Sequence, residues 1–291
     1  MLPLWLPPQS RIAILGAGGW FGHTARALLD QTVPLFLTGS RERPGIQLWH
    51  EQTLREFAPT IVLNFAFLTR ERESTMGTPA YQRANETLTQ QFLRSIELPS
   101  VVSAVTISSG AAITEPESTY GRLKRAEEEA SLALANSTRA VLVGRAYSVS
   151  GPFVRRPQDY AFSDLIEQAL RGDITVRAER PTFRRYICVR DYIEVCMRTA
   201  LRGDSGVIES GGELVEMREL AETVAATLNP DARISFEPYV SDESASYASD
   251  NSTWMRACAE LGVIEMDLEN QIRSVANWLE TDDRYDESGR A

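Results

Sequence analysis

Short apolar runs alternate with longer amphipathic stretches through the first half of the chain. Five runs have the length and β-branched content of buried strands: Arg11 to Gly16, Pro34 to Thr38, Thr60 to Ala66, Val101 to Ile107 and Ala140 to Gly144. Between them, apolar residues recur at helical spacing in Trp20 to Asp30, Leu48 to Phe57, Ala80 to Ile96 and Tyr120 to Ala135. This alternation predicts an α/β fold built on a doubly wound parallel sheet.

The pattern changes after Gly151 and Pro152. The segments that follow are irregular, rich in arginine and interrupted by proline. Helical spacing returns at Phe162 to Arg171, Asp191 to Leu201, Met217 to Leu228 and Thr253 to Leu261. We therefore predict a smaller C-terminal α/β lobe, mainly over residues 152–281, that binds substrate. A helix at about residues 191–202 is expected to pack back on the sheet, and the acidic residues 282–291 are expected to form a flexible tail.

Composition narrows the class of protein. With 291 residues, of which 43% are hydrophobic, the chain can bury a sizeable core. The net charge of -10 argues against binding to nucleic acid or to an anionic membrane surface. Three cysteines without a C-x-x-C pair, and two isolated histidines, suggest neither disulfides nor a metal site. Since no apolar stretch is long enough to span a bilayer and no basic leader precedes one, a cytoplasmic location is expected.

A glycine-rich turn directly follows the first predicted strand and opens a helix. Gly16, Gly19 and Gly22 fit the spacing G-x-x-G-x-x-G, with Trp20 and Phe21 between the last two glycines. Such a turn lets backbone N–H groups approach a pyrophosphate at the helix N-terminus. Residues 1–151 are therefore predicted to form a Rossmann-type dinucleotide-binding domain, although a glycine-rich turn can also be purely structural.

The second predicted strand ends without the acidic residue that would bind a ribose 2′-hydroxyl. The chain instead carries Ser40, Arg41 and Arg43, which can hydrogen-bond or pair with a 2′-phosphate. This favours NADP as the cofactor, with NAD still possible. The alternative is an ordinary solvated, charged loop.

The fourth predicted strand is followed by residues suited to acid/base chemistry. Ser109 stands at the strand end, and Tyr120 and Lys124 are spaced to share one face of the next helix. An ammonium beside a phenol favours the phenolate and lowers the pKa of tyrosine. Lys124 is also the only lysine among 30 basic residues. A tyrosine and a lysine four apart are otherwise often a simple surface pair.

These motifs resemble the extended short-chain dehydrogenase/reductase superfamily, in particular its NAD-dependent epimerase/dehydratase group, which modifies nucleotide sugars. The resemblance covers nearly the whole chain. It implies that Tyr120 is the catalytic acid/base, that Lys124 holds the nicotinamide ribose and tunes Tyr120, and that Ser109 binds the reacting oxygen. Ser108 is the less favoured serine.

The resemblance extends to further positions. It implies cofactor contacts from Phe65 and Ala66, which follow Asn64, and from Asn85. It implies substrate contacts from Ser148 and from Arg184, whose guanidinium would bind the diphosphate. Tyr247 and Asn251 are weaker candidates for the nucleotide end of the pocket. By the same analogy, Ala80 to Ile96 and Tyr120 to Ala135 would form the interface of a homodimer, although a monomer also fits the periodicity.

Departures from the family pattern bear on the reaction. Sugar dehydratases of the group carry an Asp-Glu pair after the hydroxyl residue of the fourth strand, whereas this chain has Gly110 and Ala111. Dehydration is therefore disfavoured. Because the loop after the second predicted strand favours NADP, we expect reduction, by NADPH, of a keto group on a nucleotide-linked sugar. A 4-epimerase with tightly bound cofactor is the alternative. A non-catalytic NADP-binding regulator is the third reading, disfavoured because Tyr120 and Lys124 are both present.

Overall fold

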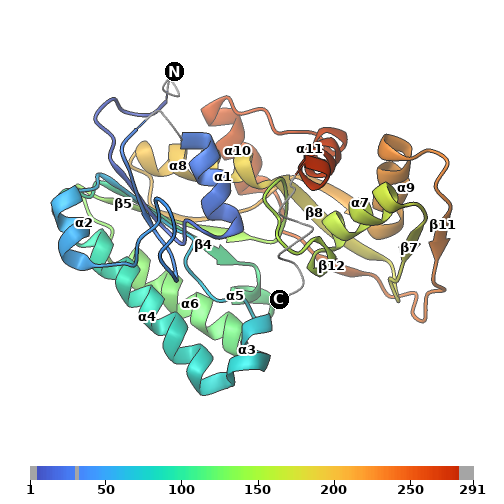
Figure 1. Cartoon of the computed structure of the whole chain (residues 1–291), viewed down its shortest axis with the longest axis horizontal. Helices are drawn as coiled ribbons and strands as arrows, with labels where there is room; N and C mark the ends of the chain where they lie inside the picture. The colour runs from blue at the N-terminus through green and yellow to red at the C-terminus, as the bar shows by residue number, and fades with distance from the viewer. Residues whose placement is uncertain (1–4, 30–32, 282–291) are drawn as a thin grey trace. The chain divides into compact units, whose positions relative to one another are not determined.

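The computed structural model describes residues 5–29 and 33–281 and divides them into two compact units (Figure 1). The first unit contains the described residues up to Ala146, together with Ile193–Glu209 and Ala259–Leu261. The second contains Tyr147–Tyr192, Ser210–Cys258 and the described residues from Gly262 onward. The tail predicted over residues 282–291 lies outside the described residues.

The first unit is built on a six-stranded parallel sheet. Its strand order is β2-β1-β3-β4-β5-β9, and every pairing is parallel. The strands are β1 (Ile12–Leu15), β2 (Leu35–Thr38), β3 (Ile61–Asn64), β4 (Ser103–Ser109), β5 (Ala140–Ala146) and β9 (Gly206–Glu209). The predicted doubly wound sheet is confirmed. Because the chain crosses to the other side of β1 after β2, the carboxyl ends of β1 and β3 lie at a switch point, where such sheets bind ligands.

Helices cover both faces of this sheet. They are α1 (Trp20–Leu29), α2 (Glu51–Phe57), α3 (Glu71–Met76), α4 (Thr78–Ile96), α5 (Ala111–Thr114), α6 (Thr119–Leu132) and the part of α8 (Val189–Leu201) from Ile193 onward. In Figure 1, α1 and α8 lie on one side of the strands, and α2, α4 and α6 lie on the other. The sequences of β1 and β3 read IAIL and IVLN because a strand covered on both faces needs no polar alternation.

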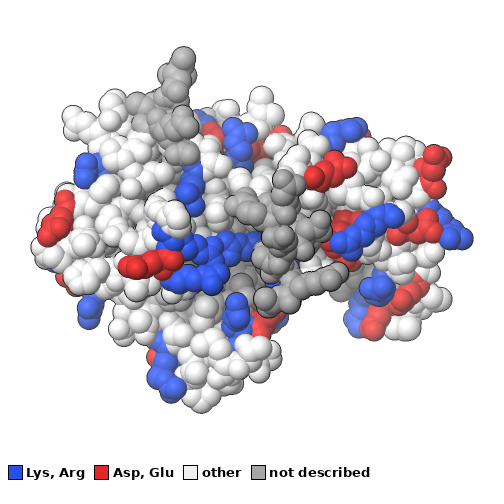
Figure 2. Space-filling model, viewed as in Figure 1, with Lys and Arg blue, Asp and Glu red and all other residues white. Residues whose placement is uncertain are grey.

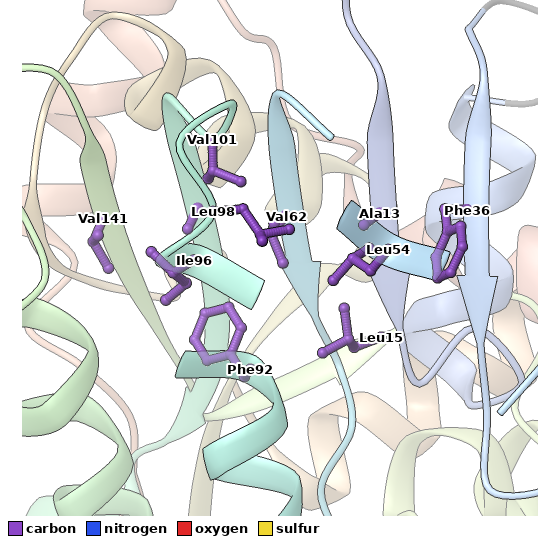
Figure 3. Packing of buried hydrophobic residues seen from close by; sticks show 11 residues of the cluster. Ala13, Leu15, Phe36, Leu54, Val62, Phe92, Ile96, Leu98, Val101 and Val141 are labelled. Carbon is purple, nitrogen blue, oxygen red and sulfur yellow. The ribbon is translucent and has the colours of Figure 1, made fainter. Parts of the chain in front are cut away.

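A continuous apolar core joins α2 and α4 to the sheet. Leu54 of α2 and Phe92 and Ile96 of α4 pack against Leu15 and Val62 of the strands, and all five are buried (Figure 3). Burial of this apolar area holds the strands in register. The loops that leave the carboxyl ends of the strands are thereby held in fixed positions.

The second unit contains short strands that the sequence pattern does not predict. Its four-stranded sheet pairs β8 (Thr182–Cys188) with β10 (Glu213–Glu216), β12 (Ala245–Tyr247) and β6 (Ser148–Ser150), and β7 (Ile174–Val176) pairs with β11 (Ile234–Phe236). Its helices are α7 (Ala161–Arg171), α9 (Met217–Leu228), α11 (Leu268–Thr281) and the part of α10 (Ser252–Leu261) up to Cys258, beside a 3-10 turn at Pro157–Asp159. The arginine-rich segment around residue 184, expected to be irregular, is therefore a strand.

The charged surface and the hydropathy of the helices bear on what the protein could bind. On the face shown in Figure 2, acidic and basic side chains are mixed over much of the surface, and one group of basic side chains lies near the middle of the view. Among residues 5–29 and 33–281, no helix combines the length and the apolar character needed to cross a bilayer.

Candidate active site

The turn between β1 and α1 contains two glycines in crowded positions. Gly16 has φ +78, and a Cβ atom there would lie 2.6 Å from the backbones of Phe65 and Ala66. A Cβ atom on Gly22 would lie 2.6 Å from the Cα of Ala17. Packing therefore explains these two glycines, and it brings Phe65 and Ala66 against the turn.

Gly18 and Gly19, in the same turn, are far less crowded. A Cβ atom on Gly19 would meet only the carbonyl oxygen of Gly16, at 3.4 Å, and one on Gly18 would meet side-chain atoms at 3.9 and 4.0 Å. The ten-residue helix α1 begins immediately afterwards at Trp20. The positive end of the helix dipole lies at this start. The turn thus offers room and a favourable field for a pyrophosphate.

Aromatic side chains fix the start of α1. The rings of Trp20 and Phe21 meet edge to face at 6.3 Å, and Phe21 packs on Phe65 with ring centroids 5.9 Å apart. Phe21 and Phe65, both predicted to contact the cofactor, therefore join the N-terminus of α1 to the loop after β3.

The glycines give a matched pair of variants. Gly19→Ala is expected to weaken dinucleotide binding about tenfold, because the added methyl group occupies the open space before the helix while the fold is undisturbed. Gly22→Ala is expected to lower the free energy of unfolding by about 1–3 kcal/mol, because its methyl group meets backbone. Calorimetry with NADPH and urea unfolding measure the two effects. If Gly19→Ala lost stability and bound NADPH normally, the turn would be structural only.

The loop after β2 lies beside this turn. Arg43 is half-buried, and its backbone N–H and carbonyl oxygen both bond to Ile46 at 2.9 Å. Its guanidinium lies 4.0 Å from the position that a Cβ atom on Gly18 would take. Ser40 and Arg41 are exposed on the same loop. Of the three predicted phosphate ligands, Arg43 is thus the one that the structure places against the glycine turn.

Ser109 and Tyr120 meet at the carboxyl end of β4. Ser109 is the last residue of β4, Tyr120 lies in the first turn of α6, and their side chains hydrogen-bond. Ser118 caps α6 by accepting a hydrogen bond from the backbone N–H of Gly121 at 2.9 Å. Gly121 lies against the carbonyl oxygen of Glu115, where no side chain would fit. The cap and this close approach together position Tyr120.

Lys124 is buried one turn further along α6. Its ammonium donates to the carbonyl oxygen of Ile107 at 2.8 Å and to the carboxylate of Glu127 at 2.9 Å. The ammonium also lies 3.6 Å from the centroid of the Phe67 ring. The structure therefore places Lys124 on the predicted face of the helix, but engages its ammonium with the protein itself.

Glu127 joins the helix to two strands. Its carboxylate accepts hydrogen bonds from the amide of Asn64 at 2.7 Å and from the hydroxyl of Thr106 at 3.1 Å. Its side chain is 1% exposed and that of Lys124 is 4% exposed. Because both charges are buried, each is stabilised by the other. Removing either side chain would leave an unpaired charge in the interior.

The pKa of Tyr120 is raised, whereas the sequence analysis predicts that Lys124 lowers it. Burial raises this pKa above its ordinary value, and the charge of Glu127 adds to the rise. The hydrogen bond from Ser109 and the positive charge of Arg70 act in the opposite direction. The prediction that Tyr120 has a lowered pKa is therefore wrong for this structure. The phenol is protonated at neutral pH and is able to donate a proton.

Ser108, the serine less favoured from the sequence, bonds to a glutamate of α6. Its hydroxyl donates to the buried carboxylate of Glu128, which also receives bonds from the guanidinium of Arg145 at 2.7 to 3.1 Å. Ser109 is therefore the serine that meets Tyr120.

A pocket of about 630 Å³ in the first unit has Tyr120 in its wall. The other lining residues come from the start of α3 and of α4 and from the loop before α6; they are Arg70, Glu71, Glu73, Ser74, Gly77, Thr78, Glu115 and Ser118. The phenol thus lies beside a space large enough for part of a small-molecule substrate.

Asn85 of α4 is fully buried and acts on the loop after β3. Its side chain accepts a hydrogen bond from the backbone N–H of Leu68 at 2.7 Å. The hydroxyl of Tyr81 donates to the carbonyl oxygen of Leu68 at 2.8 Å. Asn85, predicted to contact the cofactor, thus contacts the loop that carries Phe65 and Ala66.

The predicted substrate residues all lie in the second unit. Arg184 of β8 lies over the ring of Tyr247 of β12, with 5.1 Å to its centroid, and Tyr147 packs on the same ring at 5.0 Å. Ser148 opens β6 and pairs with β8 two residues beyond Arg184. Asn251 has φ +69 and a buried side-chain oxygen without a hydrogen-bond partner in the described structure. The structure thus brings Arg184 and Tyr247 together.

Three residues beside Tyr120 were missed from sequence. Phe67 and Arg70 lie in the loop that follows β3, and Glu127 lies in α6. The pair of Lys124 and Glu127, spaced i and i+3, was visible as a possible helix ion pair. Nothing local links Phe67 or Arg70 to Tyr120, which lies 50 or more positions further along the chain.

Residues 12–210 match the model of the NAD dependent epimerase/dehydratase family. No curated protein matches the chain in sequence.

Several solved structures share the fold. MoeE5, in complex with UDP-glucose and NAD, is 22% identical with a TM-score of 0.73, over 93% of this chain and 99% of that one. UDP-N-acetylglucosamine 4-epimerase from Methanobrevibacter ruminantium M1 is 15% identical with a TM-score of 0.77, over 94% and 99%. TunA, an NAD dependent NDP-hexosamine 5,6-dehydratase, is 22% identical with a TM-score of 0.73, over 95% and 99%.

Proposed function

Because the chain belongs to the NAD dependent epimerase/dehydratase family and is an enzyme of the extended short-chain dehydrogenase/reductase type, we propose that it reduces a keto group on a nucleotide-linked sugar with NADPH. The observation that carries this proposal is the hydrogen-bonded pair of Ser109 and Tyr120, in which burial keeps the phenol protonated. Reduction of a ketone needs a proton donor at this position, whereas epimerisation begins with proton removal.

Tyr120 and Ser109 have different roles in this reaction. When bound, the nicotinamide dinucleotide supplies a hydride for the carbonyl carbon. Tyr120 donates its proton to the carbonyl oxygen as negative charge develops there, and Ser109 hydrogen-bonds the same oxygen. The product is an alcohol, and the Tyr120 phenolate recovers a proton from solvent.

The choice of NADP rests on the loop after β2. Arg43 lies against the glycine turn, where it would pair with a 2′-phosphate, and Ser40 and Arg41 are exposed beside it. MoeE5 is bound to NAD, so cofactor preference is a property to be tested on this chain itself.

Arg43→Ala tests the cofactor preference. We expect the Kd for NADPH to rise about tenfold or more and that for NADH to change little, because only NADPH carries the 2′-phosphate. Fluorescence titration measures both constants, and Arg55→Ala, an exposed arginine of α2, serves as the control. An equal loss for the two cofactors would remove the basis for an NADP preference.

The substrate class is supported by the second unit and by the structural neighbours. MoeE5 binds UDP-glucose and the Methanobrevibacter enzyme is a UDP-N-acetylglucosamine 4-epimerase. In this chain, Arg184 would bind the diphosphate and Ser148 the sugar, with Tyr247 and Asn251 toward the nucleotide. TunA is a dehydratase, but here the positions after Ser109 are the small residues Gly110 and Ala111, which supply no acid or base for eliminating water.

The decisive experiment follows NADPH absorbance with a panel of keto and ordinary nucleotide sugars. Consumption of NADPH only with a keto sugar supports the reductase. Interconversion of two sugars without net consumption of cofactor would identify the epimerase, the second candidate. Saturable binding without either reaction would point to a regulator. A homodimer through α4 and α6 stays a prediction, for which light scattering is the measurement.

A further inference from the structure

The residue before Ser109 is tied to a buried ion pair. The hydroxyl of Ser108, which is 3% exposed, donates to the carboxylate of Glu128 in α6. The guanidinium of Arg145 in β5 donates to both oxygens of the same carboxylate, at 2.7 to 3.1 Å. Because a planar guanidinium binds a carboxylate through two parallel hydrogen bonds, the orientation of Glu128 is well defined. We refer to Ser108, Glu128 and Arg145 as the serine clamp.

Arg145 is itself held between two neighbouring strands. In the sheet it lies opposite Ser108 of β4 on one side and opposite Glu209 of β9 on the other. Its guanidinium pairs with the carboxylate of Glu209 at 3.5 Å. One side chain therefore joins the carboxyl ends of β4, β5 and β9, where the candidate site lies.

The backbone fixes the residues that follow Ser109. The N–H of Gly110 donates to the carbonyl oxygen of Ala146, at 2.9 Å. The N–H of Ala111 donates to the hydroxyl oxygen of Ser109, at 3.2 Å. A hydroxyl that accepts a bond in this way keeps its own hydrogen for donation. Its bond to Tyr120 lowers the pKa of the phenol and thus favours the phenolate, to which Ser109 can only donate.

Glu128 also belongs to the helix that carries Tyr120. Tyr120, Lys124 and Glu128 follow one another at intervals of four residues and therefore lie along one side of α6. The hydrogen bond from Ser108 to Glu128 joins this helix to β4 about two turns after Tyr120. Both partners of the bond between Ser109 and Tyr120 are thus attached to one carboxylate, the serine through its strand and the tyrosine through its helix.

We propose that Ser108 is a positioning residue of the site, which, through Glu128 and Arg145, fixes the end of β4 so that the hydroxyl of Ser109 donates to Tyr120 and to the oxygen that Tyr120 protonates. Ser108 acts through Ser109 rather than on the substrate. The two adjacent serines therefore have different tasks, one in the clamp and one in the reaction. The inference rests on the proposed function in one respect, namely that Ser109 and Tyr120 carry out the proton transfer.

The test measures the ionisation of residue 120 without turnover. Tyr120 is replaced by 2,3,5-trifluorotyrosine, whose fluorines lower the pKa of the phenol and report its ionisation by fluorine NMR. The midpoint of the titration is measured in the parent protein and with Ser108→Ala, Ser109→Ala or both added. These changes replace neutral side chains by neutral ones. The charged and titratable groups around residue 120 are thereby kept; they are Arg70, Glu71, Tyr81, Glu115, Lys124 and Glu127.

Ser109→Ala is expected to raise the midpoint by about one pH unit, because the phenolate loses a hydrogen bond. Ser108→Ala should raise it by about half a unit, because the backbone bond of Gly110 still holds one side of Ser109. When Ser109→Ala is also present, Ser108→Ala should cause no further rise, since no hydroxyl is left to position.

Ser103→Ala is the matched control. Ser103 lies in the same strand and is buried, and its hydroxyl has no hydrogen-bond partner among the described residues. This substitution should leave the midpoint unchanged. An equal rise in Ser103→Ala and Ser108→Ala would show a general loosening of β4 and would overturn the proposal.

Two further results would reject the role of Ser108. One is an unmoved midpoint in Ser108→Ala. The other is a rise that persists in full beside Ser109→Ala, because the clamp would then affect residue 120 without Ser109. Arg145→Lys keeps the charge but replaces the planar fork by a single ammonium, and it should raise the midpoint in the same direction. If Ser108→Ala does not fold, Arg145→Lys decides alone.

This outcome is separable from that of the proposed function. The titration reports on the hydrogen bonds of residue 120 even if no keto sugar is ever reduced. Conversely, reductase activity with an unmoved midpoint in Ser108→Ala would retain the function and reject the clamp.

Discussion

Tyr120→Phe is expected to lower the turnover number for NADPH consumption about 10³-fold while changing the Kd for NADPH less than twofold. The substitution removes only the hydroxyl that donates the proton and leaves the ring packed on Phe67. General acid catalysis by a positioned side chain contributes roughly 10²- to 10⁴-fold. Steady-state kinetics and fluorescence titration of NADPH on the same sample give both numbers.

Two controls sharpen this result. Tyr160→Phe removes the hydroxyl of an exposed tyrosine in the second unit and should leave turnover unchanged. Ser109→Ala should cause a smaller loss than Tyr120→Phe, because the serine binds the reacting oxygen without supplying the proton. Full turnover in Tyr120→Phe would exclude this tyrosine as the donor.

Glu127→Ala is expected to lower the free energy of unfolding by about 3–5 kcal/mol, the usual cost of removing one partner of a buried ion pair. The substitution leaves the buried ammonium of Lys124 without its counter-charge and removes the carboxylate oxygen to which Asn64 and Thr106 both donate. Urea unfolding followed by circular dichroism measures the change. Glu129→Ala, an exposed glutamate on the same helix, should shift stability by less than about 0.5 kcal/mol.

The double variant Lys124→Met with Glu127→Leu separates burial of charge from loss of packing. It should recover much of the lost stability, because two apolar side chains carry no desolvation penalty. If Glu127→Ala cost no more than Glu129→Ala, the buried pair would be of no consequence for the fold.

The sequence predicted the first unit well because its elements are long and repetitive. The strand at Ile12–Leu15 and the helix at Trp20–Leu29 lie within one residue of their predicted ends. Apart from the seven-residue Thr182–Cys188, the strands of the second unit, such as Ser148–Ser150, have three or four residues and too few alternations to be recognised. Leu268–Thr281 is different, because its apolar residues do recur at helical spacing, although this helix is not among those predicted above.

For the candidate site, the spacing of residues close together in the sequence was informative. Contacts between residues far apart in the sequence could not be predicted. The separation of Tyr120 from Lys124 correctly placed both on one face of α6. It did not reveal that Phe67 lies against both side chains, because residue 67 reaches them only through the pairing of β3 with β4. The burial that raises the pKa of Tyr120 is likewise a property of the assembled unit.

The contacts of Glu127 also restrict how α6 can move. Its carboxylate bonds at the same time to Asn64 of β3 and Thr106 of β4, and it pairs with Lys124 of its own helix. A slide of the helix by one turn, about 5.4 Å, would leave buried polar groups on all three elements without their hydrogen-bond partners at once. Three contacts of one carboxylate therefore oppose a slide of α6 along its axis at the same time.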